Sequence, residues 1–404
     1  MGKKFVITGF YGAGNTGDEA ILQSIINILR ANHDNCEITA LTYRPEETAN
    51  KYGVNTIWRP NIGRESLNID WKSMIVAVND ADAVIVGGGG LFQDNHSFLT
   101  VPRYLQTAFL AQMLNTPTII FSIGAGPIKS RIVKKQIESV VGRSNNITTR
   151  DEYSKQVLQD AGVKSAIEIS ADPVFSLEKD ESGHQIIDEI IDSDQSQCLG
   201  VSLRDYELED DDKAEIASFL DTLSPDHEIV FIPFGEGGGG EATDYEVSKQ
   251  VNSMMESDAH VIDEIYDPTV IMGMIDRMDF VIGMRLHSVI MAAAANKLVL
   301  GISYKPKVES VLKRLGYKQD MYLTIDAGIT RADLSIAYDN ILNNEKILQE
   351  YTAMSVNRFQ ERVQQSLVNI QHQETDIGEK ITAGIEFLIT TGALGTLELK
   401  RTRF

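Results

Sequence analysis

Short apolar runs alternate with helical segments along this chain, and several of the runs end in glycine. Phe5–Thr8, Ala83–Val86 and Thr118–Ser122 are such runs in the first part of the sequence. The alternation begins again at Cys198–Leu203, after an acidic and polar stretch over residues 178–195 that we interpret as a linker. Apolar strands separated by helices are typical of a parallel sheet covered on both faces. The sequence therefore predicts an α/β fold.

The restart of this pattern predicts two domains, because a chain of 404 residues is too long for one ordinary core. We expect two Rossmann-like domains with a GT-B-like organisation, followed by a long C-terminal helix over about residues 331–371. The predicted limits are 1–185 for the N-terminal domain, 196–330 for the C-terminal domain, and 331–404 for a helical extension and tail. A cleft between the two halves is the expected site.

Charge and cysteine content exclude several classes of partner. The formal net charge of −21 argues against nucleic acid and against anionic lipid bound through a broad basic face. Cys36 and Cys198 fit no metal spacing, so we expect two reduced thiols in a cytoplasmic protein without a metal site. We see no signal-peptide pattern, and the longest apolar stretches are too short to span a membrane.

The segment Asp279–Ser288 carries the strongest functional signal. An apolar run ends at Gly283, and Arg285 and His287 follow directly before the alanine-rich segment Val289–Ala295. Backbone N–H groups and the helix dipole favour an anion at such a strand-to-helix turn. In open α/β sheets this is also the edge where ligands bind. We therefore predict a site for a small anionic substrate here.

A glycine-rich loop near the N-terminus, Gly12–Gly17, matches the dinucleotide pattern G-x-G-x-x-G. Two carboxylates, Asp18 and Glu19, follow it at the start of a predicted helix. Carboxylates there repel a pyrophosphate, but they complement sugar hydroxyls or cap the helix. The second strand ends in Leu41–Arg44 without an acid for a ribose. Sugar binding, a capped turn without a ligand, and nicotinamide binding stay open.

Two further arginines, Arg150 and Arg204, each end a predicted strand. With Arg285 they can supply three guanidinium groups at the carboxyl edges of the sheets, where they suit carboxylate and phosphate. The alternative for each is an ion pair, for example with the adjacent Asp151 or Asp205.

A second glycine run, Gly87–Gly90, follows another predicted strand. Such a run lets a ligand approach the backbone closely. Gln93 and Asp94 lie just after it and can then form hydrogen bonds with the ligand. The alternative is an ordinary strand-to-helix turn with a solvated aspartate.

Taken together, these segments resemble the polysaccharide pyruvyl transferase family, especially its cell-surface-anchoring branch. Each motif alone is weak, but the ordered set over about residues 5–315 is specific. The matching stretches are GFYGAGNTGDEAIL (9–22), GGGGLFQD (87–94), SIGAGP (122–127), TTRDEYS (148–154), ADPVFSL (171–177), GVSLRD (200–205), VIGMRLHSVIMAA (281–293) and GISYKPKV (301–308).

The resemblance implies a GT-B-like fold and transfer of a pyruvyl group from phosphoenolpyruvate to two hydroxyls of a sugar, as a cyclic ketal. It also implies that Arg150 and the triplet Arg285-Leu286-His287 hold the donor. Protonation of the enol carbon C3 needs an acid, for which a histidine such as His287 is suited. His287 can instead only bind phosphate.

Our full set of predicted site residues follows from these hypotheses. The predicted catalytic residues are Asp18, Asp94, Arg285 and His287. The predicted phosphoenolpyruvate ligands are Arg150, Arg204, Arg285, Leu286, His287 and Lys307. The predicted acceptor ligands are Gly14, Asn15, Asp18, Glu19, Gly89, Gln93 and Asp94, which places the acceptor on the N-terminal domain and the donor on the C-terminal domain.

Two positions depart from the family pattern. Family members commonly carry an acid where Lys305 stands, and many carry a glutamine where Phe234 and Gly235 lead into a glycine run. Both departures leave the identity of the acceptor sugar open.

The expected partners are phosphoenolpyruvate as co-substrate, with no other cofactor, and a cell-surface glycan precursor. A lipid-linked acceptor would bring the protein to the inner face of the membrane. A homo-oligomer stays open, with the tail as one candidate contact. The alternative functions are a GT-B glycosyltransferase that uses a nucleotide sugar and a non-catalytic glycan-binding or assembly protein.

Overall fold

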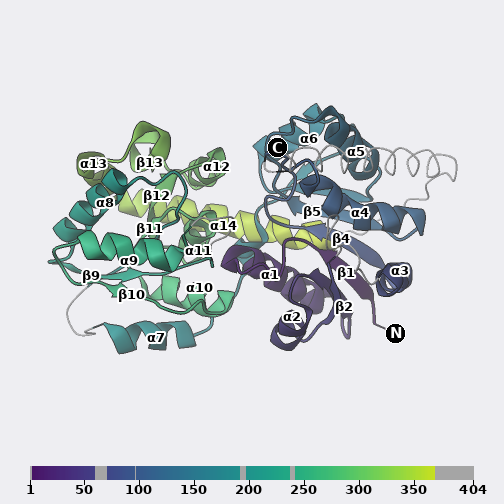
Figure 1. Ribbon diagram of the computed structural model, residues 1–404, viewed down its shortest axis with the longest axis horizontal. Helices are drawn as coiled ribbons and strands as arrows, with labels where there is room; N and C mark the ends of the chain where they lie inside the picture. Colours follow the sequence, from purple (N-terminus) through teal and green to yellow (C-terminus); the bar gives the residue numbers. More distant parts are fainter. Residues whose placement is uncertain (1, 60–70, 96, 192–196, 237–241, 369–404) are drawn as a thin grey trace, which may run out of the picture. The chain divides into compact units, whose positions relative to one another are not determined.

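The computed structural model describes residues 2–59, 71–95, 97–191, 197–236 and 242–368. Its contacts divide the chain into two compact units, each with its own parallel sheet (Figure 1). The first unit contains residues 1–13, 21–173 and 361–404, and the second contains 14–20 and 174–360. The glycine run from Gly237 and the tail predicted after the last helix lie outside the described residues.

The first unit is a doubly wound sheet. Among the described residues its strands lie in the order β3-β2-β1-β4-β5-β6-β7, and all pairs are parallel. The strands are β1 (Lys4–Thr8), β2 (Glu37–Thr42), β3 (Asn55–Trp58), β4 (Ala83–Gly87), β5 (Thr118–Ile123), β6 (Asn146–Thr149) and β7 (Glu168–Ile169). The helices are α1 (Thr16–Asn32), α2 (Pro45–Tyr52), α3 (Trp71–Asp80), α4 (Thr100–Met113), α5 (Arg131–Val141) and α6 (Glu152–Asp160).

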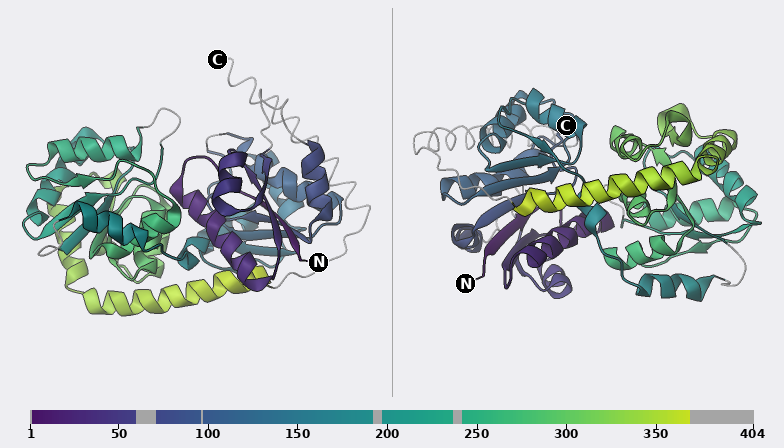
Figure 2. Two further views of the ribbon diagram at one scale, coloured as in Figure 1. Left: turned by 90° about the horizontal axis from the view of Figure 1, so that it is seen from below. Right: turned by 180° about the vertical axis from the view of Figure 1, so that it is seen from behind.

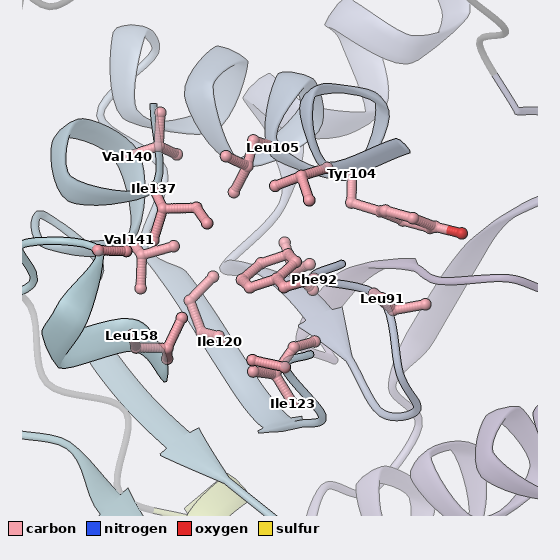
Figure 3. Close-up of a cluster of buried hydrophobic side chains, with 14 of the residues drawn as sticks. Leu91, Phe92, Tyr104, Leu105, Ile120, Ile123, Ile137, Val140, Val141 and Leu158 are labelled. Atoms are coloured by element: carbon pink, nitrogen blue, oxygen red, sulfur yellow. The ribbon is translucent and has the colours of Figure 1, made fainter. Parts of the chain in front are cut away.

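The apolar strands predicted from the sequence are buried because helices cover both faces of this sheet. Figure 3 shows Ile120 of β5 among Leu105 of α4 and Ile137 of α5, in a cluster that also contains Phe92. On the other face, α1 packs closely on β4. The Ile25 side chain of α1 lies 2.9 Å from the position that a Cβ on Gly87 of β4 would take. Burial of such side chains contributes about 1.5–3 kcal/mol each.

The second unit repeats this design. Its described strands lie in the order β10-β9-β8-β11-β12-β13, again all parallel. The strands are β8 (Gln197–Ser202), β9 (His227–Phe231), β10 (His260–Val261), β11 (Phe280–Gly283), β12 (Leu298–Ser303) and β13 (Tyr322–Thr324). The helices are α7 (Ser182–Ile190), α8 (Asp210–Leu223), α9 (Asp244–Met254), α10 (Pro268–Arg277), α11 (Leu286–Ala294), α12 (Pro306–Arg314) and α13 (Arg331–Leu342).

The interpretation of residues 178–195 as a linker was wrong, because half of this segment, Ser182–Ile190, forms α7. The helix packs closely on α10 through two glycines. A Cβ on Gly183 would lie 2.2 Å from the carbonyl oxygen of Val270, and one on Gly273 would lie 2.1 Å from that of Asp180. Ion pairs of Asp276 with Lys179 and of Arg277 with Asp188 complete the contact.

The predicted helix over 331–371 is two helices, α13 and α14 (Glu345–Val368), and Figure 2 shows α14 as a long single helix. The break falls at Asn343 and Asn344. The Asn344 side chain donates to the carbonyl oxygen of Asn340, which is the local bonding that makes asparagine a helix-ending residue. The contact-based units also differ from the predicted domain limits, since Gly14–Ala20 packs with the second unit.

Candidate functional site

Four neighbouring strands of the second unit present chemically active residues at their carboxyl ends. In the order β9-β8-β11-β12, these ends lead into Gly235, Arg204, Arg285 and Tyr304. β8 and β11 lie side by side. From β8 the chain continues to β9 and β10 on one side of the sheet, and from β11 it continues to β12 and β13 on the other side, so the strand order reverses between β8 and β11. This switch point is where open α/β sheets bind ligands.

Arg204, Tyr206, Tyr304, Lys305 and Lys307 form one group, which we call the Tyr304 cluster. The Arg204 Nη1 donates to the Tyr304 hydroxyl at 3.3 Å. Lys307 Nζ lies 5.2 Å from the centre of the Tyr304 ring, and Lys305 Nζ lies 4.6 Å from that of Tyr206. The two tyrosine rings lie 5.1 Å apart. Three cations therefore surround one buried phenol.

This charge changes the acidity of Tyr304, which is 7% exposed. Burial alone raises its pKa, but the charges of Lys307 and Arg204, a hydrogen bond with Lys307 and the charge of Arg285 outweigh that effect. The net result lowers the pKa of Tyr304 from 10.0 to about 7. Cations that stabilise a phenolate also stabilise a bound anion. Tyr304 was not among the predicted site residues, although it follows an apolar strand as the arginines do.

Arg285 is the last residue before α11, as predicted, and its guanidinium binds Asp244 at the start of α9. The Nε donates to Asp244 Oδ2 at 2.8 Å and Nη2 donates to Oδ1. Asp244 is fully buried and also accepts from the backbone N–H of Phe234 at 3.0 Å. Asp244 therefore fixes both the arginine and the loop after β9. It lies far from Arg285 in sequence, so no local pattern indicated it.

His287, in the first turn of α11, lies against the glycine-rich loop. A Cβ on Gly17 would lie 1.8 Å from His287 Nδ1, so only glycine leaves room for the imidazole here. Leu286 between the two polar residues is 3% exposed and packs in the core. The structure thus brings His287 and the loop Gly14–Gly17 together within the second unit.

Backbone bonds hold that loop against the loop after β9. The Thr16 N–H donates to the Phe234 carbonyl at 3.0 Å, the Glu236 N–H donates to that of Gly14 at 3.1 Å, and Asn15 pairs with Gly235. The departures at Phe234 and Gly235 therefore lie beside the glycine loop.

Asn15 caps the start of α1. Its side chain accepts from the N–H of Gly17 at 2.9 Å, and its carbonyl accepts from those of Asp18 and Glu19, both at 3.1 Å. The Asn15 side chain thus occupies the Gly17 N–H, which a pyrophosphate would use in a dinucleotide site, so the geometry favours the capped turn over nicotinamide binding. Both carboxylates are half-buried in the first turn of the helix.

In the first unit, Arg150 is buried and forms the predicted ion pair with Asp151, at 3.2 Å. Its Nη1 also lies 3.6 Å from Asp172 Oδ2. Gly124 leaves the space that the guanidinium occupies, because a Cβ there would lie 2.7 Å from Arg150 Cζ. The alternative pair of Arg204 with Asp205 is not formed, since Asp205 accepts from the backbone N–H of Ala242 and Arg204 binds Tyr304.

Asp94 is 4% exposed, and backbone donors use both of its carboxylate oxygens. The Lys129 N–H lies 2.9 Å and 3.0 Å from the two oxygens, and the Ser130 N–H lies 2.7 Å from Oδ2. Gln93 donates to the carbonyl of Gly90 at 3.2 Å, and Gly89 has φ +74°. This geometry suits an anchor for the loop before α5 better than a base.

We expect Asp94→Ala to lower the free energy of unfolding by about 1–3 kcal/mol, because it leaves buried N–H groups without their acceptor. Urea denaturation of the two chains measures this. Asp94→Asn keeps an acceptor oxygen and should lose less. A catalytic base would show the reverse pattern, with unchanged stability and strongly reduced turnover in both variants.

Within the described residues, no group of three or more His, Cys, Asp or Glu side chains is placed to hold a metal ion. The helices of that same part of the chain also include none with the length and apolar character needed to cross a bilayer.

Two Rossmann-like units with parallel sheets define an α/β protein of the GT-B-like class, and solved structures agree. MnaA of S. aureus, in its UDP co-structure, has a TM-score of 0.58 at 12% identity over 91% of this chain and 95% of that one. Alr3699/HepE of Anabaena with UDP-glucose has a TM-score of 0.59 at 12% identity, over 90% and 99%. A putative UDP-N-acetylglucosamine 2-epimerase of Listeria monocytogenes has a TM-score of 0.60 at 13% identity, over 90% and 94%. The fold prediction is confirmed.

The sequence model for polysaccharide pyruvyl transferase matches residues 15–306, and the chain belongs to that family. It is also similar to the amylovoran biosynthesis protein AmsJ of Erwinia amylovora, at 22% identity over 95% of this chain and 99% of that protein. The resemblance found from the motifs is therefore confirmed, and with it the prediction of a transferase of polysaccharide biosynthesis.

Proposed function

We propose that this transferase takes its pyruvyl group from phosphoenolpyruvate and joins it, as a cyclic ketal, to two hydroxyls of a sugar in a cell-surface polysaccharide precursor. The observation that carries the proposal is the Tyr304 cluster, where Arg204, Lys305 and Lys307 converge at the switch point of the second sheet. The chain has a net charge of −21, yet three cations lie together at one sheet edge, and this local positive charge favours binding of an anion there.

The chemistry of the donor matches this edge. Phosphoenolpyruvate carries a phosphate and a carboxylate, and guanidinium and ammonium groups bind both. Arg285 is less available, because Asp244 holds it through two bonds. The family resemblance assigns Arg150 to the donor. To bind the donor, Arg150 would have to give up its ion pair with Asp151 or Asp172. We assign the phosphate to Arg204, Lys305 and Lys307, because these three cations converge at this edge of the sheet.

The acceptor side is proposed from the glycine loop. Asp18 and Glu19, in the first turn of α1, are carboxylates that can accept a hydroxyl proton, and Asn15 lies just before them. His287 lies against the same loop, and we propose that it contacts the donor or the acceptor. We propose no cofactor besides the co-substrate. A lipid-linked acceptor would place the enzyme at the inner face of the membrane.

Incubation with phosphoenolpyruvate and a panel of aryl or lipid-linked glycosides tests this function. We expect mass spectrometry to find a pyruvyl ketal and a phosphate assay to find inorganic phosphate in equal amount. His287→Ala should lower both signals together. Its matched control is His227→Ala, which changes a histidine that contacts the carbonyl of Leu223 and the Tyr338 hydroxyl instead.

The same incubation with nucleotide sugars tests the glycosyltransferase alternative, which rests on fold relatives solved with UDP or UDP-glucose. Release of a nucleotide together with a new glycosidic bond would contradict our proposal and support the glycosyltransferase alternative. Sugar binding without any transfer, at unchanged affinity in His287→Ala, would instead indicate a non-catalytic glycan-binding protein.

A further inference from the structure

The donor of the proposed function, on which the following proposal rests, must receive a proton at C3. We propose that Tyr304 is the acid that protonates C3, and that binding of the anionic donor to Arg204, Lys305 and Lys307 loads Tyr304 with that proton. His287 then serves binding and positioning.

The geometry supports the first part. Tyr304 follows β12 at the sheet edge where the donor is proposed to bind, and its hydroxyl lies 3.3 Å from Arg204 Nη1. Ligands of the two neighbouring lysines would therefore lie next to this oxygen. His287 instead faces Gly17, on the side of the proposed acceptor loop. A proton donor for the enol carbon belongs beside the groups that bind its phosphate and carboxylate.

The charge balance supports the second part. The cations whose charges lower the pKa of Tyr304 are Lys307, Arg204 and Arg285, and Lys305 Nζ lies 5.9 Å from the centre of the Tyr304 ring. With the site empty, Lys307, Arg204 and Arg285 favour the phenolate, and the pKa of Tyr304 is about 7. A bound phosphate and carboxylate neutralise these cations, so the phenolate loses its stabilisation and takes a proton from solvent. Binding of the donor thus favours the protonated form of Tyr304, which is the form that can act as an acid.

The steps balance. The Tyr304 phenol gives its proton to C3 as one sugar hydroxyl bonds to C2, and the proton of that hydroxyl passes to a phosphate oxygen. The C2–O bond to phosphate then breaks, and inorganic phosphate leaves with the electron pair. The second hydroxyl bonds to C2 and its proton returns to the Tyr304 phenolate. The products are the ketal, with a methyl group from C3, and phosphate.

Tyrosinate absorbs in the near ultraviolet where tyrosine does not, so the loading step can be followed on the full chain at about pH 8. We expect a tyrosinate signal in the empty enzyme that falls when inorganic phosphate or phosphoenolpyruvate is added. Tyr304→Phe should lack the signal. Tyr338→Phe is the matched control and should keep it, because burial raises the pKa of Tyr338 and leaves it protonated.

A second variant tests the loading step independently, in case Tyr304→Phe does not fold. Lys307→Gln should move the tyrosinate titration to higher pH, because it removes a cation that lowers the pKa of Tyr304. A wild-type chain without a phosphate-sensitive tyrosinate signal would overturn the loading step, whatever the variants do.

Turnover tests the acid itself. We expect Tyr304→Phe to lose about 10²–10⁴-fold in kcat and in deuterium uptake at C3, with phosphate affinity changed by less than about tenfold. His287→Ala should keep the tyrosinate signal. Normal C3 uptake in Tyr304→Phe would overturn the assignment while the ketal product still stands. Absence of ketal from the wild-type enzyme would overturn the proposed function, whereas the phosphate titration still decides the loading step.

Discussion

Replacing Asp244 with alanine is expected to lower the free energy of unfolding of this protein by about 3–5 kcal/mol, because it leaves the charge of Arg285 buried and uncompensated. The aspartate is fully buried, and the Arg285 side chain is only 12% exposed. The substitution also removes the acceptor of the Phe234 N–H, so the loop after β9 loses its anchor. Urea denaturation followed by circular dichroism measures the loss.

Asp188→Ala provides the matched control for this prediction. Asp188 binds Arg277 at 2.7 Å in an equally short pair, but its side chain is 48% exposed. Exposed pairs contribute about 0.2–1 kcal/mol. Equal losses in the two variants would contradict the role we give to Asp244. Adding Arg285→Met to Asp244→Ala should restore part of the stability, since no buried charge then remains.

Gly17→Ala is expected to lower turnover by roughly 10²-fold or more while the protein stays folded. The new Cβ would lie 1.8 Å from Nδ1 and 2.4 Å from Cγ of His287, so the imidazole must move by about 1 Å or more. Alanine favours a helix over glycine by about 1 kcal/mol, which limits any loss of stability at this position in α1. Ketal formation and the melting temperature, measured on the same preparation, separate the two effects.

The double variant Gly17→Ala with His287→Ala tests whether the effect acts through the histidine. If it does, the added methyl group has no further effect once the imidazole is absent. A further drop of the same size in the double variant would mean that Gly17 serves the loop or the acceptor directly.

Much of the fold could be predicted because buried parallel strands leave an apolar run that their own sequence shows. β1, β4, β5 and β8 were predicted within one residue of their observed ends. The edge strands β10 and β13 were not predicted, since they are short and only partly apolar. The helix α7 was missed for a different reason. Only Gly183 and Ile187 are buried in it, and its stability comes from α10 rather than from its own pattern.

The site could be predicted only where function and strand end coincide. Arg204, Arg285 and His287 stood out because each follows an apolar strand by a few residues. The buried partner of Arg285, Asp244, lies at the start of α9, and only the fold brings the two together. Asp94 stood out in sequence, but its backbone partners lie on a loop about 35 residues away. A local motif thus indicates where a charge lies, but not what neutralises it.

The bond from the Thr16 N–H to the Phe234 carbonyl also has a consequence for biosynthesis. The segment Gly14–Ala20 leaves the ribosome early, but its partner β9 follows roughly 210 residues later, and α11 follows roughly 270 residues later. At about 5–20 residues per second, this segment waits roughly 10–50 s for them. During that time Asp18 and Glu19 keep the waiting stretch charged and hydrated, while the first sheet can form around the residues on either side of it. The proposed acceptor loop would therefore be among the first parts of the chain to be made and among the last to be ordered.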